Sequence, residues 1–282
     1  MISAVSPTKK VFRVLPRSIK EWISTVRQSG RLATVPTETF DASHLRRLDP
    51  QYLPSIFAAS PEADLGWADI KIPGGRTPGG VCAGERRAIY YLVAALKPRS
   101  VLEVGTQLGA STVVIAQALA RFSGPDARLI SLDIFDVSKP ESGGFSGGNL
   151  RSPQHKIADV GLTHMVQFIT QPALDYLRSA DQRFDLIFLD GDHSATAVYQ
   201  EVAASLRRLN ANGMILLHDF HPSNRPLFRS GRAIPGPYLA ACRIASEGGP
   251  RTLPIGDLPW PTRDGGNKTC LALVAEVGSP VS

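Results

Sequence analysis

The stretch Val101-Leu-Glu-Val-Gly-Thr-Gln-Leu-Gly-Ala-Ser-Thr112 decides the fold of this chain. A short apolar run contains Glu103, the glycines Gly105 and Gly109 follow it, and apolar residues at helical spacing begin at Ser111. A strand, a tight glycine turn and a helix N-terminus in this order are typical of a site for a nucleotide-like ligand.

The spacing of the two glycines narrows the class of ligand. The pattern is E-x-G-x-x-x-G, whereas dinucleotide-binding turns read G-x-G-x-x-G and use the third glycine beside the helix. A nicotinamide dehydrogenase is therefore disfavoured. The turn instead predicts a ligand with an adenosine end and no phosphate, of which S-adenosylmethionine is the common example.

Apolar periodicity outward from this turn predicts an α/β fold. The expected strands are 100–104, 128–133, 166–170, 185–190 and 214–218, with late β-like runs at 252–255 and 269–274. The expected helices are one from residue 84 that ends before Pro98, 111–121, 154–160, 173–180, one that buries Val198, Val202, Leu206 and Leu209, and 238–247. Five strand–helix alternations indicate a Rossmann-like parallel sheet with helices on both faces.

The chain divides into two parts by composition. Residues 1–80 are rich in proline and end in a Gly/Pro-rich segment, which predicts an N-terminal appendage and linker before a main domain at 81–282. A Gly/Ser/Pro-rich loop is expected at 137–156, and loops of that length are usually either functional lids or disordered. We expect the appendage and this loop to shape an acceptor pocket, with Trp67, Phe145 and Arg151 as candidate lining residues.

Charge and cysteine usage limit the partners and the location. The formal net charge is +6, but the basic residues are scattered, so the sequence favours an ordinary basic surface over a nucleic-acid partner. Cys82, Cys242 and Cys270 are too far apart for a disulfide framework or a zinc knuckle. We find no leader pattern and no apolar run of membrane length, so the expected location is cytoplasmic, with no membrane partner.

Polar residues at the carboxyl ends of the expected strands outline a cofactor site, because ligands bind at that edge of a parallel sheet. Asp133 is placed to accept both ribose hydroxyls of an adenosine, and Ile134 to contact the base. Gln171 follows the next strand. Glu103, within its strand, either contacts the ligand or binds groups of its own turn, and Ser111 either contacts the ligand or caps the helix.

A second group of polar residues follows two neighbouring strands. Asp190 and Asp219 are predicted to lie in one crevice and to share a cation such as Mg²⁺ or Ca²⁺, and the nearby histidines, His218 among them, would favour a softer metal if they ligate it. His193 is the predicted general base for a hydroxyl, with Asp190 beside it as a catalytic group. The open alternatives are that His193 caps the following helix, and that His218 is a core histidine.

The segments together resemble the class I S-adenosylmethionine-dependent methyltransferases, in particular the catechol and caffeoyl-CoA O-methyltransferase branch and the O-methyltransferases of antibiotic tailoring. The resemblance covers about residues 79–275. It depends on the segments Gly84-Glu-Arg-Arg-Ala-Ile-Tyr90, 101–111, Ser131-Leu-Asp133, 184–193 and Gly213-Met-Ile-Leu-Leu-His-Asp-Phe220.

The resemblance implies a Rossmann-like seven-stranded sheet with a reversed last strand and methyl transfer to a hydroxyl of a small molecule. It also implies a homodimer, by analogy with relatives. Asp190 and Asp219 match the family's ligands for Mg²⁺ or another divalent cation. Phe220 stands where a ligand asparagine is common, and His193 stands where the catechol branch has a lysine base.

Two other functions stay open at this point. A nucleic-acid methyltransferase is compatible with the charge, although no basic stripe with interleaved aromatic residues is found. A non-catalytic protein that binds S-adenosylmethionine is compatible with the glycine turn, although it gives no reason for the acids and histidines at the strand ends.

Overall fold

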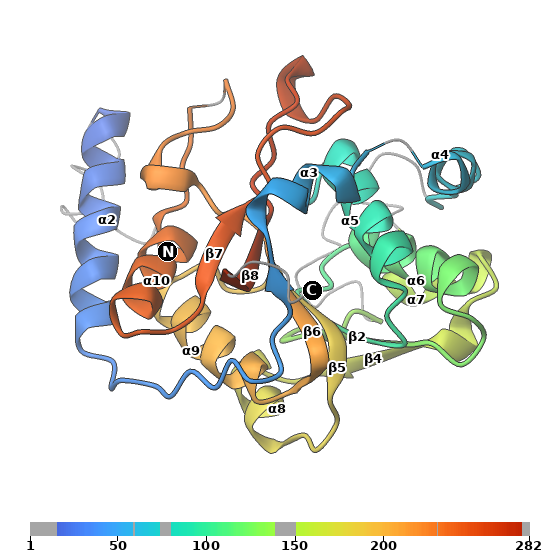
Figure 1. The fold of residues 1–282 in the computed structure, drawn as a ribbon, viewed down its shortest axis with the longest axis horizontal. Coiled ribbons are helices and arrows are strands. Elements are labelled where there is room, and N and C mark those ends of the chain that lie inside the picture. The colour runs from blue at the N-terminus through green and yellow to red at the C-terminus, as the bar shows by residue number, and fades with distance from the viewer. Residues whose placement is uncertain (1–15, 59, 74–79, 139–150, 230, 278–282) are drawn as a thin grey trace, which may run out of the picture.

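One mixed β-sheet of eight strands runs through the described part of the chain (Figure 1). The structure is a computed structural model that describes residues 16–58, 60–73, 80–138, 151–229 and 231–277. The strand order is β1-β8-β6-β5-β2-β3-β4, and β7 pairs with β8. The strands are β1 (Arg47–Leu48), β2 (Ser100–Val104), β3 (Arg128–Asp133), β4 (Val166–Thr170), β5 (Phe184–Leu189), β6 (Leu209–Leu217), β7 (Arg251–Pro254) and β8 (Ala272–Val277).

The direction of the strands confirms the predicted fold class. Strands β2 to β6 are paired in parallel, and β8 is antiparallel to both β6 and β7. The late reversal is the one that the family resemblance implies. The eighth strand is the short β1, which pairs in parallel with the outer edge of β8.

Helices cover both faces of the sheet, as Figure 1 shows with α5, α6 and α7 on one side and α2, α9 and α10 on the other. The helices are α2 (Arg17–Ala33), α3 (Leu53–Ile56), α4 (Pro61–Ala68), α5 (Ala83–Leu96), α6 (Ala110–Phe122), α7 (Pro153–Asp159), α8 (Ala173–Ser179), α9 (Ala195–Leu206) and α10 (Pro235–Ser246). Short 3₁₀ turns lie at Pro50–Tyr52, Thr163–Met165, Pro222–Asn224 and Arg263–Gly265.

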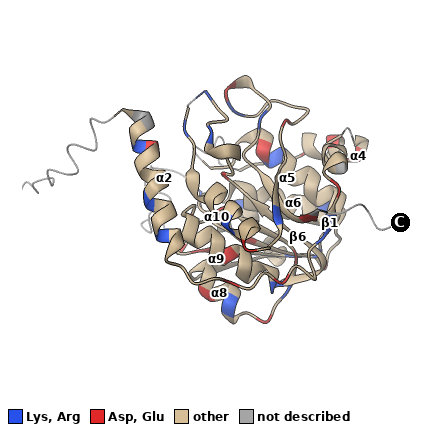
Figure 2. Cartoon of the chain, turned by 60° about the vertical axis from the view of Figure 1, so that its left-hand side comes forward, with Lys and Arg blue, Asp and Glu red and all other residues tan. Residues whose placement is uncertain are grey.

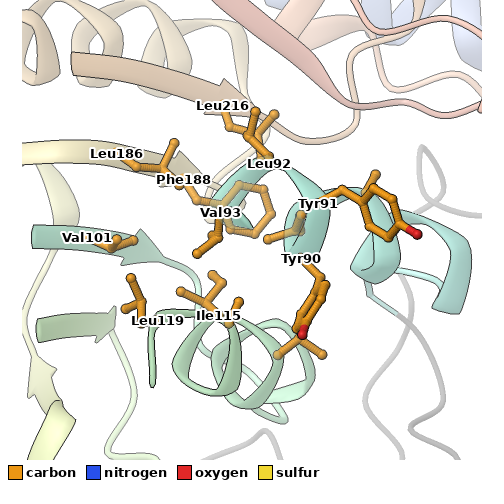
Figure 3. Packing of buried hydrophobic residues seen from close by; sticks show 14 of the residues in the cluster. Tyr90, Tyr91, Leu92, Val93, Val101, Ile115, Leu119, Leu186, Phe188 and Leu216 are labelled. Atoms are coloured by element: carbon orange, nitrogen blue, oxygen red, sulfur yellow. The ribbon is translucent and has the colours of Figure 1, made fainter. Parts of the chain in front are cut away.

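The alternation of side chains along each strand divides the core into two halves. Val101 packs with α5 and α6, and its neighbour Leu102 packs with α9 and α10. Figure 3 shows the first half, in which Phe188 of β5 and Ile115 of α6 meet Tyr90 and its neighbours on α5. Strands that are apolar on both faces are what a parallel sheet between two helical layers requires.

Residues of the predicted appendage contact the main sheet and its helices. Helix α2 lies against α9 and α10, and Oε1 of Gln28 accepts a hydrogen bond from the backbone N–H of Ala195 at 2.8 Å. The backbone N–H of Arg46 donates to the carbonyl of Gly213 at 2.9 Å, next to β1. The division at residue 80 stays a prediction.

Several element boundaries differ from the prediction by a few residues, and one residue, Leu209, lies in a different element. The apolar spacing predicts Leu209 in the same helix as Val198. The structure instead ends α9 at Leu206, and Leu209 is the first residue of β6. The carbonyl of Arg208 accepts a hydrogen bond from the N–H of Phe184 at 2.8 Å, so the chain turns into the sheet there. A buried leucine is apolar in either role, so periodicity could not separate the two.

The structure also describes the three cysteines and the length of the helices. Cys82, Cys242 and Cys270 are all free thiols. Within the described residues, none of the helices has both the length and the apolar character that crossing a membrane requires. Residues 139–150 of the predicted long loop, Phe145 among them, lie outside the described residues.

Candidate active site at the strand ends

A cavity of about 950 Å³ lies at the carboxyl ends of β2, β3, β4, β5 and β6. Eight of the predicted site residues line it together: Gly105, Asp133, Ile134, Gln171, Asp190, His193, His218 and Asp219. They come from five loops that are up to 114 residues apart in the sequence, and the parallel sheet brings them to one edge.

Asp133 lines the end of the cavity at β2 and β3 and binds two backbone N–H groups there. Its Oδ2 accepts a hydrogen bond from the backbone N–H of Gln107 at 2.9 Å, and its Oδ1 accepts one from the N–H of Phe135 at 3.0 Å. The carboxylate is thereby held against the glycine turn. Beside it, Ile134 is 62% exposed and Phe135 is 51% exposed, so the tip of β3 presents two apolar side chains at the cavity.

The two glycines of the turn have positive φ angles, and other parts of the chain lie very close to both of them. Gly105 has φ +96°, and a Cβ there would lie 2.2 Å from the carbonyl oxygen of Asp190 on the neighbouring strand. Gly109 has φ +69° and precedes α6, where a Cβ would lie 2.7 Å from Cβ of Pro153. Both glycines are required by packing against other elements of the protein.

Glu103 is fully buried, and its partners are side-chain hydroxyls. It accepts hydrogen bonds from Oγ of Ser111 at 2.5 Å, Oγ1 of Thr112 at 2.6 Å and Oγ of Ser131 at 2.6 Å. Burial raises the pKa of Glu103 to about 7, against the opposite effect of the three hydroxyl donors. These contacts link β2, β3 and the first turn of α6.

The positions of Glu103, Gly109 and Ser111 set them apart from the other predicted cofactor residues. Glu103 and Gly109 do not line the large cavity, and Ser111 lines a small neighbouring one of about 20 Å³. Gly109 is the N-cap residue of α6, so Ser111 does not have the capping role that the sequence left open. Direct contact of these residues with a ligand stays a prediction.

At the tips of β5 and β6, Asp190 and His218 lie against one another. Nδ1 of His218 is 2.8 Å from Oδ1 of Asp190 and 3.6 Å from Oδ1 of Asp219, although the contact with Asp190 is poorly aligned for a hydrogen bond. His218 is buried, which opposes protonation, but Asp190 and Cys270 raise its pKa well above the ordinary value.

His193 is the more accessible histidine of this group. Its side chain is 30% exposed, and Nε2 lies 3.4 Å from Oδ2 of Asp219 and 3.8 Å from Oδ1 of Asp190. The cap of α9 is Ser194, whose hydroxyl accepts from the N–H of Ala197 at 3.3 Å, so His193 does not cap that helix through its side chain. The imidazole is left facing the two carboxylates and the cavity.

The floor of this region contains buried groups that the sequence reasoning missed. Glu85 of α5 lies 3.6 Å from Nε2 of His218, and Sγ of Cys270 lies 3.5 Å from the same nitrogen. Burial raises the pKa of Cys270 to about 12. Burial also acts to raise the pKa of Glu85, but His218 and Arg263 outweigh that effect and hold the pKa well below its ordinary value. A glutamate three residues into a helix resembles an ordinary capping residue, so the sequence carried no clear signal.

Glu201 of α9 is a further buried carboxyl on the cavity wall. Burial and the neighbouring charge of Asp192 raise its pKa to about 8. Two candidate lining residues lie elsewhere: Trp67 packs edge-on against Tyr90 with ring centroids 5.6 Å apart, and Arg151 pairs with Asp159 at 2.6 Å. Neither is part of the cavity wall.

Comparisons with known proteins find methyltransferases similar to this chain. Residues 102–220 match the model of a family described as "Methyltransferase domain". Catechol O-methyltransferase from Mycobacterium tuberculosis is 32% identical over 132 residues, which is 46% of this chain and 53% of that relative. Catechol O-methyltransferase from Niastella koreensis is 28% identical over 132 residues, which is 45% of this chain and 53% of that relative.

A solved structure matches over more of the chain. The O-methyltransferase TomG from Streptomyces achromogenes, in complex with S-adenosylmethionine, has a TM-score of 0.50 at 17% identity, covering 84% of this chain and 100% of that one. At this identity the likeness concerns the fold alone. The chain spans about half the length of the two curated relatives.

Proposed function

Because residues 102–220 match a family described as "Methyltransferase domain", we propose that this protein transfers the methyl group of S-adenosylmethionine to a hydroxyl of a small molecule. The observation that carries the proposal is the single cavity that joins Asp133 at one end to His193 and Asp219 at the other. Calorimetry with S-adenosylmethionine tests it first. Absence of binding, with and without EDTA, would overturn the proposal.

The end of the cavity at β2 and β3 has the features that an adenosine requires. The Asp133 carboxylate can accept hydrogen bonds from ribose hydroxyls beyond its two backbone donors, because a carboxylate has about four acceptor positions. Ile134 and Phe135 offer apolar surface to the base, and Gln171 offers an amide at the neighbouring strand end. Gly105 has a positive φ and lines the cavity without a side chain, so a ligand could approach its backbone closely.

The end of the cavity at β5 and β6 has a general base. In methyl transfer, the acceptor oxygen forms a bond to the methyl carbon as the carbon–sulfur bond breaks, and the hydroxyl proton must leave. His193 would take that proton, and the carboxylate of Asp219, 3.4 Å from Nε2, would stabilise the imidazolium that forms. Asp190, 3.8 Å from the same nitrogen, adds negative charge at this position.

A divalent cation between Asp190, Asp219 and His218 stays a prediction, and the structure argues against Mg²⁺ in that position. Nδ1 of His218 faces both carboxylates, so the imidazole itself fills the space between them. The next residue, Phe220, packs against Ala241 and Ala272 and offers no donor. Mg²⁺ prefers oxygen ligands, so this set of residues does not suit it. Turnover of S-adenosylmethionine in EDTA and with added Mg²⁺ is the test.

A hydroxylated small molecule is supported as the acceptor by two observations. The two curated relatives are catechol O-methyltransferases. In addition, Lys and Arg positions are interspersed with Asp and Glu over the elements in Figure 2, which does not favour a nucleic-acid acceptor. Methyl transfer from labelled S-adenosylmethionine to a panel of hydroxylated metabolites, with RNA as a comparison, would identify the class, and no transfer to any of them would favour a non-catalytic binding protein.

A homodimer through α2 is supported by the face that this helix turns outward. Ile19, Trp22 and Val26 are 41%, 65% and 50% exposed and lie three and four residues apart, while the helix packs on α9 and α10. Light scattering after gel filtration should give twice the chain mass for the wild type and one chain mass for Trp22→Glu. A monomeric wild type would overturn this part of the proposal.

A further inference from the structure

Three buried side chains of mixed donor type converge under the floor of the cavity. Glu85 comes from α5, His218 follows β6, and Cys270 precedes β8; all three are almost completely buried. From this cluster we propose a zinc-type metal site, with Glu85, His218 and Cys270 as the protein ligands. The proposal is independent of methyl transfer, since it concerns the inner edge of the His218 ring and not the edge that faces Asp190.

The spacing of the donor atoms fits such an ion. Sγ of Cys270 lies 3.1 Å from Oε1 of Glu85 and 3.5 Å from Nε2 of His218, and Nε2 lies 3.6 Å from Oε2 of Glu85. With Zn–S of ~2.3 Å and Zn–N of ~2.0–2.1 Å, neighbouring ligand atoms of a tetrahedral site lie ~3.3–3.6 Å apart. One donor atom from each of the three residues already lies within 4.8 Å of the other two, and rotation of the Glu85 carboxylate would bring one of its oxygens closer to both Sγ and Nε2.

The groups behind the ligands also match a metal site. Metal-binding histidines commonly direct their second ring nitrogen at a carboxylate, and Nδ1 of His218 lies 2.8 Å from Oδ1 of Asp190. Ligating carboxylates are in turn hydrogen-bonded. Glu85 accepts from the backbone N–H of Cys82 at 3.1 Å and from Oγ1 of Thr269 at 3.2 Å, which holds its two oxygens toward the cluster.

The sulfur has more polar neighbours than a thiol can satisfy. Besides Glu85 and His218, Oδ1 of Asp219 lies 3.5 Å from Sγ of Cys270. The sulfur can accept from Nε2 of a protonated His218, but its one S–H proton can be donated to only one of the two carboxylates, Glu85 or Asp219. A divalent ion bound by the thiolate and a neutral imidazole would replace two protons, and so would leave the net charge of the cluster unchanged. Arg263, 3.5 Å from Glu85, is the positive group that already faces it.

The donor types select the class of ion. A thiolate and an imidazole favour Zn²⁺ over the hard cations Mg²⁺ and Ca²⁺, which prefer oxygen. Asp219 lines the cavity and touches the sulfur, so it marks the direction of a fourth ligand. The ion would tie α5, the end of β6 and the start of β8 together directly beneath the cavity.

The experiment is metal analysis of the full chain, purified without a histidine tag or chelator. We expect about one zinc per chain. After exchange into Co²⁺, we expect a near-ultraviolet thiolate-to-cobalt charge-transfer band that is lost in Cys270→Ser and retained in Cys242→Ser, since Cys242 is an exposed thiol. Glu85→Gln should lower zinc affinity at least tenfold.

Several outcomes would overturn the inference. One is that the wild-type chain binds neither Zn²⁺ nor Co²⁺ stoichiometrically. Another is that the charge-transfer band survives in Cys270→Ser. If Cys270→Ser does not fold, X-ray absorption at the zinc edge of the wild type decides, because a first shell without sulfur contradicts the proposal. Binding of S-adenosylmethionine is measured in parallel, so failure of the metal site leaves the proposed function intact.

Discussion

Nε2 of His193 lies 3.4 Å from Oδ2 of Asp219, so the histidine after β5 and the carboxylate after β6 face one another across the tips of two neighbouring strands. The pair is separated by 26 positions in the sequence and is joined by the parallel pairing of β5 with β6. The ring of His193 is partly exposed and lines the cavity, and the carboxylate of Asp219 would be the partner of its protonated form. The proposed role of His193 as a base for the acceptor hydroxyl depends on this relationship.

Replacing His193 by alanine should therefore remove turnover and spare the cofactor. We expect kcat to fall ~10²–10⁴-fold, the usual contribution of a general base, with the Kd for S-adenosylmethionine changed less than a few-fold. Steady-state kinetics and calorimetry measure the two effects. His164→Ala, at an exposed histidine, is the matched control, and a large loss of cofactor affinity in His193→Ala would contradict the catalytic role.

Asp133→Asn should weaken cofactor binding without stopping the fold. Loss of a hydrogen bond to a charged group costs ~1.5–3 kcal/mol, so we expect the Kd for S-adenosylmethionine to rise ~10–100-fold. The amide keeps one acceptor oxygen, so one of the two backbone donors, Gln107 or Phe135, also loses its partner in this variant. Thermal unfolding of the ligand-free variant shows whether the turn is intact. Asp126→Asn, at an exposed surface pair with Arg99, should leave affinity unchanged.

Gly105→Ala should destabilise the protein far more than Gly124→Ala. Both glycines have left-handed backbone, with φ +96° and +89°, but a Cβ at residue 105 would strike the carbonyl of Asp190 whereas a Cβ at residue 124 has no neighbour within 4 Å. We expect Gly105→Ala to lower the unfolding free energy by more than ~1–3 kcal/mol, the cost of backbone strain alone. Equal denaturation midpoints for the two variants would contradict the close approach.

Glu103 should make stability depend on pH in a defined window. Its pKa is raised to about 7 in the folded state, against 4.5 as the ordinary value. The folded chain therefore keeps a proton that the unfolded chain loses first, and this contribution to the unfolding free energy is full below pH 4.5 and declines as the pH rises to about 7.

Comparison with Glu103→Gln isolates this effect. The unfolding free energy of the wild type minus that of the variant should fall between pH 4.5 and 7 and be constant above that range. Urea denaturation at four pH values measures the difference. Parallel pH profiles for the two proteins would show that Glu103 does not titrate in this window.

Much of the fold was predictable because it depends on local patterns. The β2–α6 unit follows from a short apolar run, two glycines and helical spacing, each of which acts within a few residues. The cavity residues Asp133, Asp190 and Asp219 were predictable for a related reason: each follows an apolar strand, and parallel strands end at one edge of the sheet. The prediction of Leu209 as a helical residue was wrong, because a buried leucine is equally compatible with a helix and with a strand.

The sequence therefore establishes the order of strands and helices, the glycine turn and the polar residues at the strand ends, because hydrophobic period and turn chemistry are properties of neighbouring residues. The tertiary structure decides which side chains share a partner. It alone directs Ser111 to Glu103 in place of the helix cap, and it alone brings Glu85, His218 and Cys270, 185 positions apart at the extremes, into one buried cluster. Such contacts depend on how helices pack across a sheet, and no spacing within the chain encodes that geometry.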